Sequence, residues 1–242
     1  MNSKKKEPIL KFLDKLVKLL HFLPSEFSHY LSLTGLKVIE KLGLIKQKNL
    51  TKGAYTSDKI STLGFNLSNR VGLAAGLDKN GDYIDSLASL GFSFLEIGTV
   101  TPRAQRGNPK PRLFRLNTKR SLLNSMGFNN KGVDHVISQL KKRKTDAVIG
   151  ISVGKNWDTP LEKAVEDYLY CFQKTYPYVD YLAINISSPN TRDLRKLEEI
   201  NHFKELLKAL KFEQRKLKRN FGYKPIVLKL SPDIKFDRQK EI

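Results

Sequence analysis

The sequence is poor in cysteine and has no long uninterrupted apolar run. Its single cysteine, Cys171, rules out a disulfide within the chain and favours a reducing compartment. Lysine or proline interrupts every apolar stretch before it reaches the roughly 18 residues that a membrane span needs. The start, Met-Asn-Ser-Lys-Lys-Lys, has the charge of a signal peptide, but Asp14 and Lys15 break the apolar segment that should follow. We therefore expect a cytoplasmic chain without a transmembrane helix.

Acidic residues are scarce beside basic ones. The chain has 24 Asp and Glu against 44 Lys and Arg, which gives a formal net charge of +20. Such an excess favours an anionic partner, and a basic protein that binds RNA or anionic lipid is one hypothesis. The lysines are, however, spread over several predicted helices, including 141–144 and 208–218, without a nucleic-acid-binding motif or an aromatic platform. We therefore expect no nucleic-acid partner; a steep fall of affinity with salt would support the alternative.

Short β-branched apolar segments alternate with longer helical ones. The predicted strands are bounded by Gly, Pro or Asn and lie at 71–79, 94–99, 147–156, 181–184 and 225–232. The predicted helices between them lie at 83–90, 131–144, 161–175 and 200–221. Strand alternating with helix predicts an α/β fold with a parallel sheet whose strands are buried on both faces.

Polar side chains follow these strands where each one ends. The apolar run Tyr181-Leu-Ala-Ile is followed directly by Asn185-Ile-Ser-Ser-Pro-Asn-Thr191. In parallel α/β barrels the active site lies at this end of the strands, so the segment is a candidate for substrate contacts. The alternative is a turn in which Asn and Ser bond their own backbone. Several strand ends share the pattern, which favours the functional interpretation.

Five motifs, taken in order, resemble the dihydroorotate dehydrogenases of pyrimidine synthesis. They are Gly-Leu-Ala-Ala-Gly-Leu-Asp-Lys79, Glu96-Ile-Gly-Thr-Val-Thr-Pro-Arg, Asn124-Ser-Met-Gly-Phe-Asn-Asn, Gly-Lys-Asn156 and Asn185-Ile-Ser-Ser-Pro-Asn-Thr. The resemblance runs from about Ser25 to the last residues. The soluble branch of that family carries a cysteine base where this chain has Ser188, so the match is to the membrane-associated, quinone-linked branch.

The resemblance implies oxidation of dihydroorotate to orotate with FMN and a membrane quinone as electron acceptor. Ser188 is then the general base that removes a proton from C5 while flavin N5 accepts hydride from C6. A serine hydroxyl must pass that proton onward, and the family does so along a water path bordered by the positions of Phe128 and Thr191. Lys79 would hold the substrate carboxylate, and Lys229 would lie beside the N1 and O2 edge of the flavin.

The same resemblance assigns three sets of contacts and no metal ligand. The substrate set is Lys79, Asn124, Ser125, Met126, Gly127, Phe128, Asn185, Asn190 and Thr191. The flavin set is Ala75, Gly76, Leu77, Asp78, Lys79, Thr99, Ser152, Asn185 and Lys229. His29 and Arg115 match positions that line the quinone tunnel. Two departures bear on the site: Ser152 stands where the family usually has asparagine, and Arg192-Asp193 where a small residue and glycine are usual.

The amino-terminal residues 1–48 form a separate basic unit of two predicted helices. In the first, residues between Ile9 and Leu23 place Leu and Phe at three- and four-residue spacing opposite lysines, the pattern of an amphipathic helix. The second runs from Ser25 to about Leu42 and stops at Gly43. We expect the pair to lie on the cytoplasmic membrane as a peripheral anchor and to guide quinone to the flavin. The alternative is that both helices only cap the open end of a barrel.

Length limits what residues 49–242 can build. An eight-stranded (β/α)8 barrel of the TIM type takes about 250 residues, whereas this part of the chain has fewer than 200. Only five strand-helix units are predicted, and nothing resembles the later family segments that cradle the flavin phosphate. We therefore expect an incomplete FMN-binding barrel: a truncated form or inactive fragment with impaired activity alone, or a chain completed by a second chain that supplies the missing strands.

Overall fold

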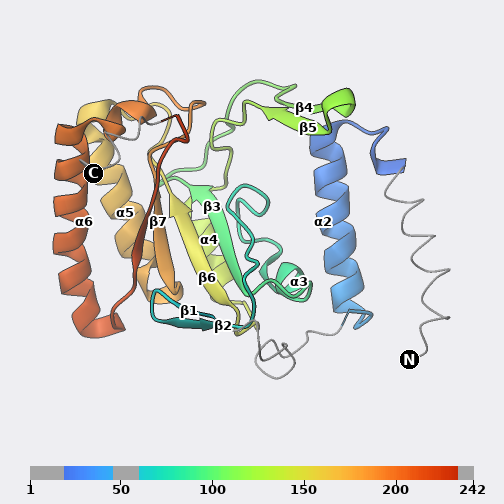
Figure 1. The fold of residues 1–242 in the computed structure, drawn as a ribbon, viewed down its shortest axis with the longest axis horizontal. Helices are drawn as coiled ribbons and strands as arrows, with labels where there is room; N and C mark the ends of the chain where they lie inside the picture. Colours follow the sequence, from blue (N-terminus) through green and yellow to red (C-terminus); the bar gives the residue numbers. More distant parts are fainter. Residues whose placement is uncertain (1–18, 46–59, 234–242) are drawn as a thin grey trace.

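The computed structural model describes residues 19–45 and 60–233. Its centre is a parallel sheet in the order β3-β6-β7-β8 (Figure 1). The strands are β3 (Phe94–Val100), β6 (Val148–Val153), β7 (Tyr181–Asn185) and β8 (Ile226–Lys229). Within this sheet each strand pairs in parallel with the one named after it. Parallel neighbours require a crossover connection between them. The predicted α/β class with a parallel sheet is confirmed.

Helices supply these crossovers. They are α4 (Val133–Leu140), α5 (Ala164–Thr175) and α6 (Ile200–Phe221), while α3 (Ile84–Ala88) precedes β3. Single 3-10 turns at 161–163, 176–178 and 194–198 flank α5 and lead into α6. The α6 helix buries one side at three- and four-residue spacing, through Phe203, Leu206 and Leu210. The predicted bounds of α6 are confirmed, whereas α3 and α4 are shorter than predicted.

The two faces of the sheet differ in polarity. Successive strand residues point to opposite faces, and the register sets Glu96 opposite Gly150 and Gly150 opposite Tyr181. One face carries buried aliphatic side chains, namely Leu95, Ile97, Ile149, Ile151, Leu182 and Ile184. The other face carries Glu96, Ser152, Tyr181, Asn185 and Lys229. Polar groups are therefore concentrated on one face of the sheet, although the strand sequences are mainly apolar.

The predicted strand at 71–79 is wrong in extent. Only an isolated bridge between Leu73 and Leu95 forms beside β3. The Leu73 N–H donates to Phe94 O at 2.9 Å, and the Glu96 N–H donates to Leu73 O at 2.8 Å. Beyond this point Gly76 adopts φ +114°, which turns the chain out of the extended path. The segment still lies beside β3, since the Gly76 N–H donates to Gly98 O at 2.8 Å and the Gly98 N–H donates to Asp78 O at 3.0 Å, but it forms no regular fifth strand.

Two antiparallel hairpins lie at opposite ends of the sheet, and neither was predicted. The first joins β1 (Ile60–Thr62) to β2 (Phe65–Leu67) at the end where the parallel strands start. The second joins β4 (Leu113–Leu116) to β5 (Ser121–Asn124) at the end where they stop (Figure 1). Strands of three or four residues are too short to show a period in the sequence.

The α2 helix (Ser25–Lys41) stands on the far side of the molecule from α5 and α6 (Figure 1). It agrees with the second predicted helix and is attached through Lys37, whose Nζ donates to Asp82 O at 2.7 Å. Most of the first predicted helix, and the predicted boundary near residue 48, fall outside the described residues. Within the described part of the chain, we find no helix with the length and apolar content to cross a membrane.

Candidate active site

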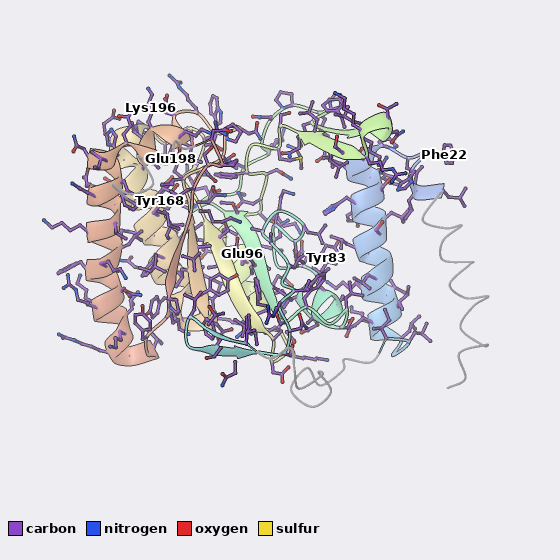
Figure 2. All side chains as sticks on the ribbon, in the orientation of Figure 1. Phe22, Tyr83, Glu96, Tyr168, Lys196 and Glu198 are labelled. Atoms are coloured by element: carbon purple, nitrogen blue, oxygen red, sulfur yellow. The ribbon has the colours of Figure 1, made fainter. Side chains whose placement is uncertain are left out.

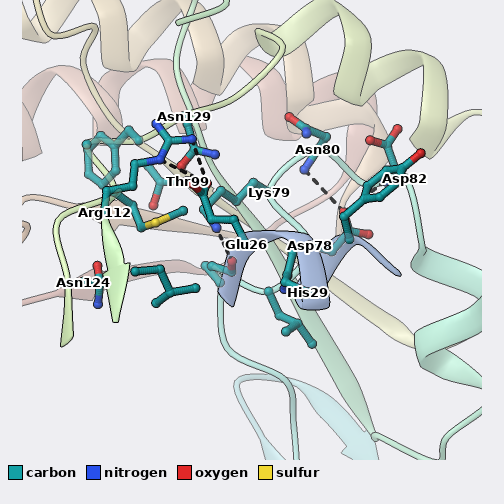
Figure 3. Close-up of a pocket in the computed structure, with 18 of the residues that line it drawn as sticks. Glu26, His29, Asp78, Lys79, Asn80, Asp82, Thr99, Arg112, Asn124 and Asn129 are labelled. Atoms are coloured by element: carbon teal, nitrogen blue, oxygen red, sulfur yellow. Dashed lines mark hydrogen bonds and ion pairs between the residues drawn. The ribbon is translucent and has the colours of Figure 1, made fainter. Parts of the chain in front are cut away.

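A cavity of about 1070 Å³ lies at the carboxyl ends of the parallel strands, between the sheet and α2. Its walls come from α2, the loop at 75–83, the β4–β5 hairpin, the segment after it, and the ends of β3, β7 and β8 (Figure 3). The predicted residues that line it are His29, Ala75, Gly76, Leu77, Asp78, Lys79, Thr99, Asn124, Met126, Gly127, Phe128, Asn185, Ser188, Asn190 and Lys229. Segments far apart in the sequence thus meet in one cavity, as the position of the motifs at strand ends predicted.

Four predicted residues do not line the cavity: Ser125, Ser152, Thr191 and Arg115. The Ser125 N–H donates to Arg112 O at 2.9 Å, next to the last pair of the β4–β5 hairpin, so its predicted contact with substrate stays a prediction. Sequence reasoning missed a larger group of lining residues, which includes Glu26, Tyr30, Asp82, Arg112 and Asn129. Most of these come from α2 or from loops between the motifs, where no strand end marks a position as functional.

The loop at 75–83 presents Lys79 to the cavity. The buried Asp78 carboxylate shapes this loop by accepting the backbone N–H groups of Asn80, Asp82 and Tyr83 at 3.4, 3.0 and 2.8 Å. Lys79 Nζ donates to Gly76 O at 2.5 Å. Burial, with the positive charge of Arg112, lowers the pKa of Lys79. A half-desolvated ammonium in a cavity is suited to holding an anionic ligand such as a carboxylate.

Gly76 leaves open space against the cavity wall. A Cβ built at this position would meet no other atom within 4 Å, and its φ of +114° belongs to the region that favours glycine. The backbone beside Ala75 and Gly76 is therefore accessible to a flat molecule at close range. The family resemblance implied flavin contacts at these residues, and those contacts stay a prediction.

A chain of side-chain hydrogen bonds links three strands beneath the cavity. Asn185 Nδ2 donates to Thr99 Oγ1 at 2.9 Å, and Thr99 Oγ1 lies 2.8 Å from Ser152 Oγ. Ser152 is fully buried behind Thr99 and is absent from the cavity wall. Its hydroxyl therefore orients Thr99 in this structure, whereas a direct contact with flavin was the prediction for this position.

Lys229 is held at the floor of the cavity by an ion pair. Its Nζ lies 2.7 Å from Glu96 Oε1, and Tyr181 donates its hydroxyl to Glu96 Oε2 at 3.2 Å. Burial and the nearby Glu96 carboxylate raise the pKa of Tyr181, so its hydroxyl stays a neutral donor. The three side chains come from β8, β3 and β7. Lys229, the cation that was predicted beside the flavin, is thus held by Glu96, which Tyr181 in turn holds.

The loop after β7 carries Ser188. The Ser188 side chain lines the cavity, and its Oγ accepts the Asn190 N–H at 3.3 Å. Asn185 Oδ1 accepts the N–H and the hydroxyl of Ser187 at 3.2 and 3.1 Å, so the local turn that was the alternative interpretation is also present. The same Asn185 binds Thr99 across the sheet. Turn formation and presentation of polar groups to the cavity therefore occur together.

Two residues near Ser188 have unusual local environments. Thr191 is 4% exposed, and its Oγ1 makes no hydrogen bond to any described residue. Asp193, at the position where glycine was expected, adopts φ +56°. Aspartate tolerates this left-handed conformation better than most residues, at a modest cost in conformational energy. Asp193 therefore adopts a backbone conformation that glycine, the residue expected here, would also adopt.

Two arginines of the hairpin region hold the start of α2. Arg112 is 5% exposed and donates to Glu26 Oε1 from Nε at 3.0 Å and from Nη2 at 2.9 Å (Figure 3). Arg115 donates from Nη1 to His21 O at 3.2 Å and to Leu23 O at 2.7 Å. Arg115 therefore caps backbone carbonyls of the chain before α2 and does not face the cavity. Its predicted contact with quinone stays a prediction.

His29 projects from α2 into the cavity (Figure 3). Burial lowers the pKa of His29 below its ordinary value of 6.5, and the positive charge of Lys79 lowers it further. The unfolded chain then binds a proton more readily than the folded chain does. Stability should be lost as the pH falls through 6.5 toward the lowered pKa.

We therefore expect His29→Gln to reduce the dependence of unfolding free energy on pH between about pH 7 and pH 5. Urea unfolding at the two pH values measures this slope in the parent chain and the variant. Thr34→Ser, an uncharged change on the α2 wall of the same cavity, is the matched control and should keep the parent slope. An unchanged slope in His29→Gln would show that this histidine does not contribute.

Comparisons with known proteins identify the same family that the five motifs resemble. A family model described as dihydroorotate dehydrogenase matches residues 58–242. A protein named dihydroorotate dehydrogenase (quinone) from Methylobacillus flagellatus is 51% identical over 213 residues, which cover 88% of this chain and 62% of that protein. A protein of the same name from Acinetobacter baylyi is 48% identical over 217 residues, which cover 89% and 63%. The chain thus spans a little under two thirds of the length of these curated relatives.

Solved structures agree with the sequence matches. The crystal structure of DHODH from Eimeria tenella in complex with ferulenol superposes with a TM-score of 0.79 at 30% identity, covering 90% of this chain and 62% of that one. The ligand-free structure from the same organism gives a TM-score of 0.76 at 32% identity. The range of the family model includes all five motifs, whereas the α2 wall of the cavity lies before it. The chain therefore belongs to the dihydroorotate dehydrogenase family.

Proposed function

We propose that this protein takes part in the oxidation of dihydroorotate to orotate, with FMN as cofactor and a membrane quinone as electron acceptor. One observation carries the proposal: Lys79, Asn124, Asn185, Ser188 and Lys229 meet in a single cavity at the carboxyl ends of the strands. Orotate is planar and anionic and has amide edges. Asparagines that donate and accept, together with a lysine for the carboxylate, are suited to such a ligand.

The residues around the cavity fit FMN. When bound, the flavin supplies the hydride acceptor. The open backbone at Ala75 and Gly76 would lie along the ring, and Thr99 and Asn185 would offer hydrogen bonds to it. Lys229, held by Glu96, would place a fixed positive charge near the ring edge. Leu77 and Asp78 would form the adjoining part of the flavin site, in the loop that the Asp78 carboxylate holds in shape.

The protein's own side chains would handle the substrate proton. Ser188 would accept the proton from C5 at its Oγ, and the buried hydroxyl of Thr191 would border the route along which it leaves. Phe128, which is 9% exposed, would keep bulk water from that side. The substrate set proposed here is Lys79, Asn124, Ser125, Met126, Gly127, Phe128, Asn185, Asn190 and Thr191.

We further propose that the described sheet is part of a (β/α)8 barrel formed by residues 49–242 together with segments that correspond to the remaining length of the relatives. The chain covers 62% and 63% of two of them. Phosphate sites of such barrels usually follow strands seven and eight. The missing strands, from a longer or a second chain, would then complete the FMN site, so the described part alone would bind flavin weakly.

Residues 1–48 would bring the active site to the cytoplasmic face of a membrane. The support is that α2 forms one wall of the cavity, with His29 facing inward. A lipid quinone reaching the flavin from the bilayer would pass along this helix. His29 and Arg115 are the residues proposed for this path, Arg115 through its hold on the segment before α2.

Anaerobic flavin reduction tests this function. The 242-residue chain is compared with an extended chain, to which the carboxy-terminal third of the Methylobacillus relative has been joined. Each is loaded with FMN, freed of excess cofactor, mixed with dihydroorotate, and followed by flavin absorbance. We expect the extended chain to retain FMN and bleach, and a quinone to restore the colour. Retained flavin that does not bleach would contradict the proposed reaction.

A further inference from the structure

We propose that the β4–β5 hairpin, with the segment just before α2, is a surface that rests on an anionic lipid bilayer. The inference rests on the proposed quinone-linked function, because a lipid quinone requires contact with a membrane. It goes beyond the two amino-terminal helices, since it assigns the contact to a hairpin of the barrel portion. Three separate features of the hairpin carry it: its apolar outer face, its basic tip and its attachment to α2.

The outer face of the hairpin is apolar and exposed. Phe114 pairs directly with Leu123 across the two strands, and Leu116 lies two residues further on the same face. Their exposed fractions are 41%, 59% and 38%. Leu113 and Leu122 point the other way and line the cavity. A hairpin face in contact with water is normally polar, so apolar residues on both faces indicate a second contact.

The tip of the hairpin is basic. Lys119 and Arg120 are exposed at the turn between β4 and β5, and Arg120 adopts φ +47°. No Asp or Glu occurs between Glu96 and Asp134, so no acidic residue within this stretch neutralises them. Cations beside an exposed apolar face form the pattern that favours anionic phospholipid headgroups over an aqueous or purely apolar partner.

Side-chain hydrogen bonds join the hairpin region to the start of α2 and to the residues before it. Arg112 binds Glu26, and Arg115 binds the carbonyls of His21 and Leu23. Phe22 lies between these two carbonyls in the chain and is 87% exposed, near the same end of the molecule as the hairpin (Figure 2). Arg115 pairs with Leu122 on the cavity face of the hairpin, so the amino-terminal segment meets the hairpin on the face opposite Phe114. The cavity, whose wall includes Leu113 and Leu122, opens beside this surface.

Sedimentation with vesicles tests the proposal. Vesicles of phosphatidylcholine with about one third phosphatidylglycerol are compared with pure phosphatidylcholine vesicles. Each lysine or arginine near an anionic surface favours binding by roughly fivefold, so Lys119→Gln combined with Arg120→Asn should weaken binding to the anionic vesicles about 10- to 30-fold. Asparagine is chosen at 120 because it accepts the left-handed conformation. Leu123→Ser should weaken binding to both kinds of vesicle.

The matched control removes two charges elsewhere. Lys204→Gln with Lys208→Gln changes two exposed lysines of α6, on the far side of the sheet, and should alter binding less than about threefold. Equal losses in the control and hairpin variants would overturn the proposal, as would unchanged binding of the hairpin variants or no binding by the parent chain. Circular dichroism confirms that each variant is folded.

Vesicle binding requires neither flavin nor dihydroorotate, so the two proposals fail separately. Hairpin variants of the extended chain should bleach their flavin with dihydroorotate at the parent rate. If the hairpin supports vesicle binding but no bleaching occurs in the parent, the membrane surface stands and the proposed reaction fails. If the parent bleaches and the hairpin variants bind vesicles as well as the parent does, the proposed reaction is supported and the proposed membrane surface is contradicted.

Discussion

Replacing Glu96 with leucine should lower the free energy of unfolding by about 2–3 kcal/mol. Removing one partner of a fully buried ion pair costs about 3–5 kcal/mol, because the other charge is left without compensation. The Glu96 side chain is 10% exposed, but the Lys229 side chain is 31% exposed and keeps part of its hydration, which reduces the expected loss. Tyr181 also loses its acceptor. Urea unfolding followed by circular dichroism measures the difference.

The control is a double-mutant cycle with Lys229. Removing both charges in Glu96→Leu with Lys229→Leu should recover a large part of the stability lost in Glu96→Leu alone, because no unpaired charge remains. Glu96→Gln, which keeps an acceptor for Tyr181, should fall between the parent and Glu96→Leu. Additive losses in the cycle would show that the 2.7 Å contact contributes no coupling energy.

The arrangement of the parallel sheet could be predicted because long periodic segments reveal it. The bounds of α6 at Ile200–Phe221 agree with the prediction, and α2 differs by about one residue at its end. Both helices have a clear start signal or apolar period. The segment at 71–79 has the composition of a strand, yet hydrogen bonds to the Asp78 carboxylate form a loop there. Local composition does not encode that competing set of contacts.

The site was predictable where chemistry follows a strand, and not where distant segments pair. Lys79, Asn185, Ser188 and Lys229 each follow an apolar run and all line the cavity. Arg112 and Glu26 are separated by 86 residues, and no spacing rule connects them. The same holds for Ser152, which faces Thr99 because of the register between β3 and β6 and not because of its neighbours in sequence.

Replacing Ser188 with alanine should slow flavin reduction by dihydroorotate about 10²- to 10⁴-fold in the extended chain, the range expected when a positioned general base is lost. Ser188→Cys should retain more activity, because a thiol also accepts and passes on a proton, and its rate should rise at lower pH than that of serine. Stopped-flow absorbance at several pH values measures both rates, with retained FMN as evidence that the site is intact.

The competing interpretation of Ser188 makes a different forecast for the same variants. If Ser188 serves only the turn, through the 3.3 Å bond from the Asn190 N–H, then Ser188→Ala should lower stability slightly and leave the reduction rate near that of the parent. Thr191→Val separates the two cases further. Its buried Oγ1 has no bond to lose among the described residues, so a slower rate at unchanged stability would place this hydroxyl on the route of the proton.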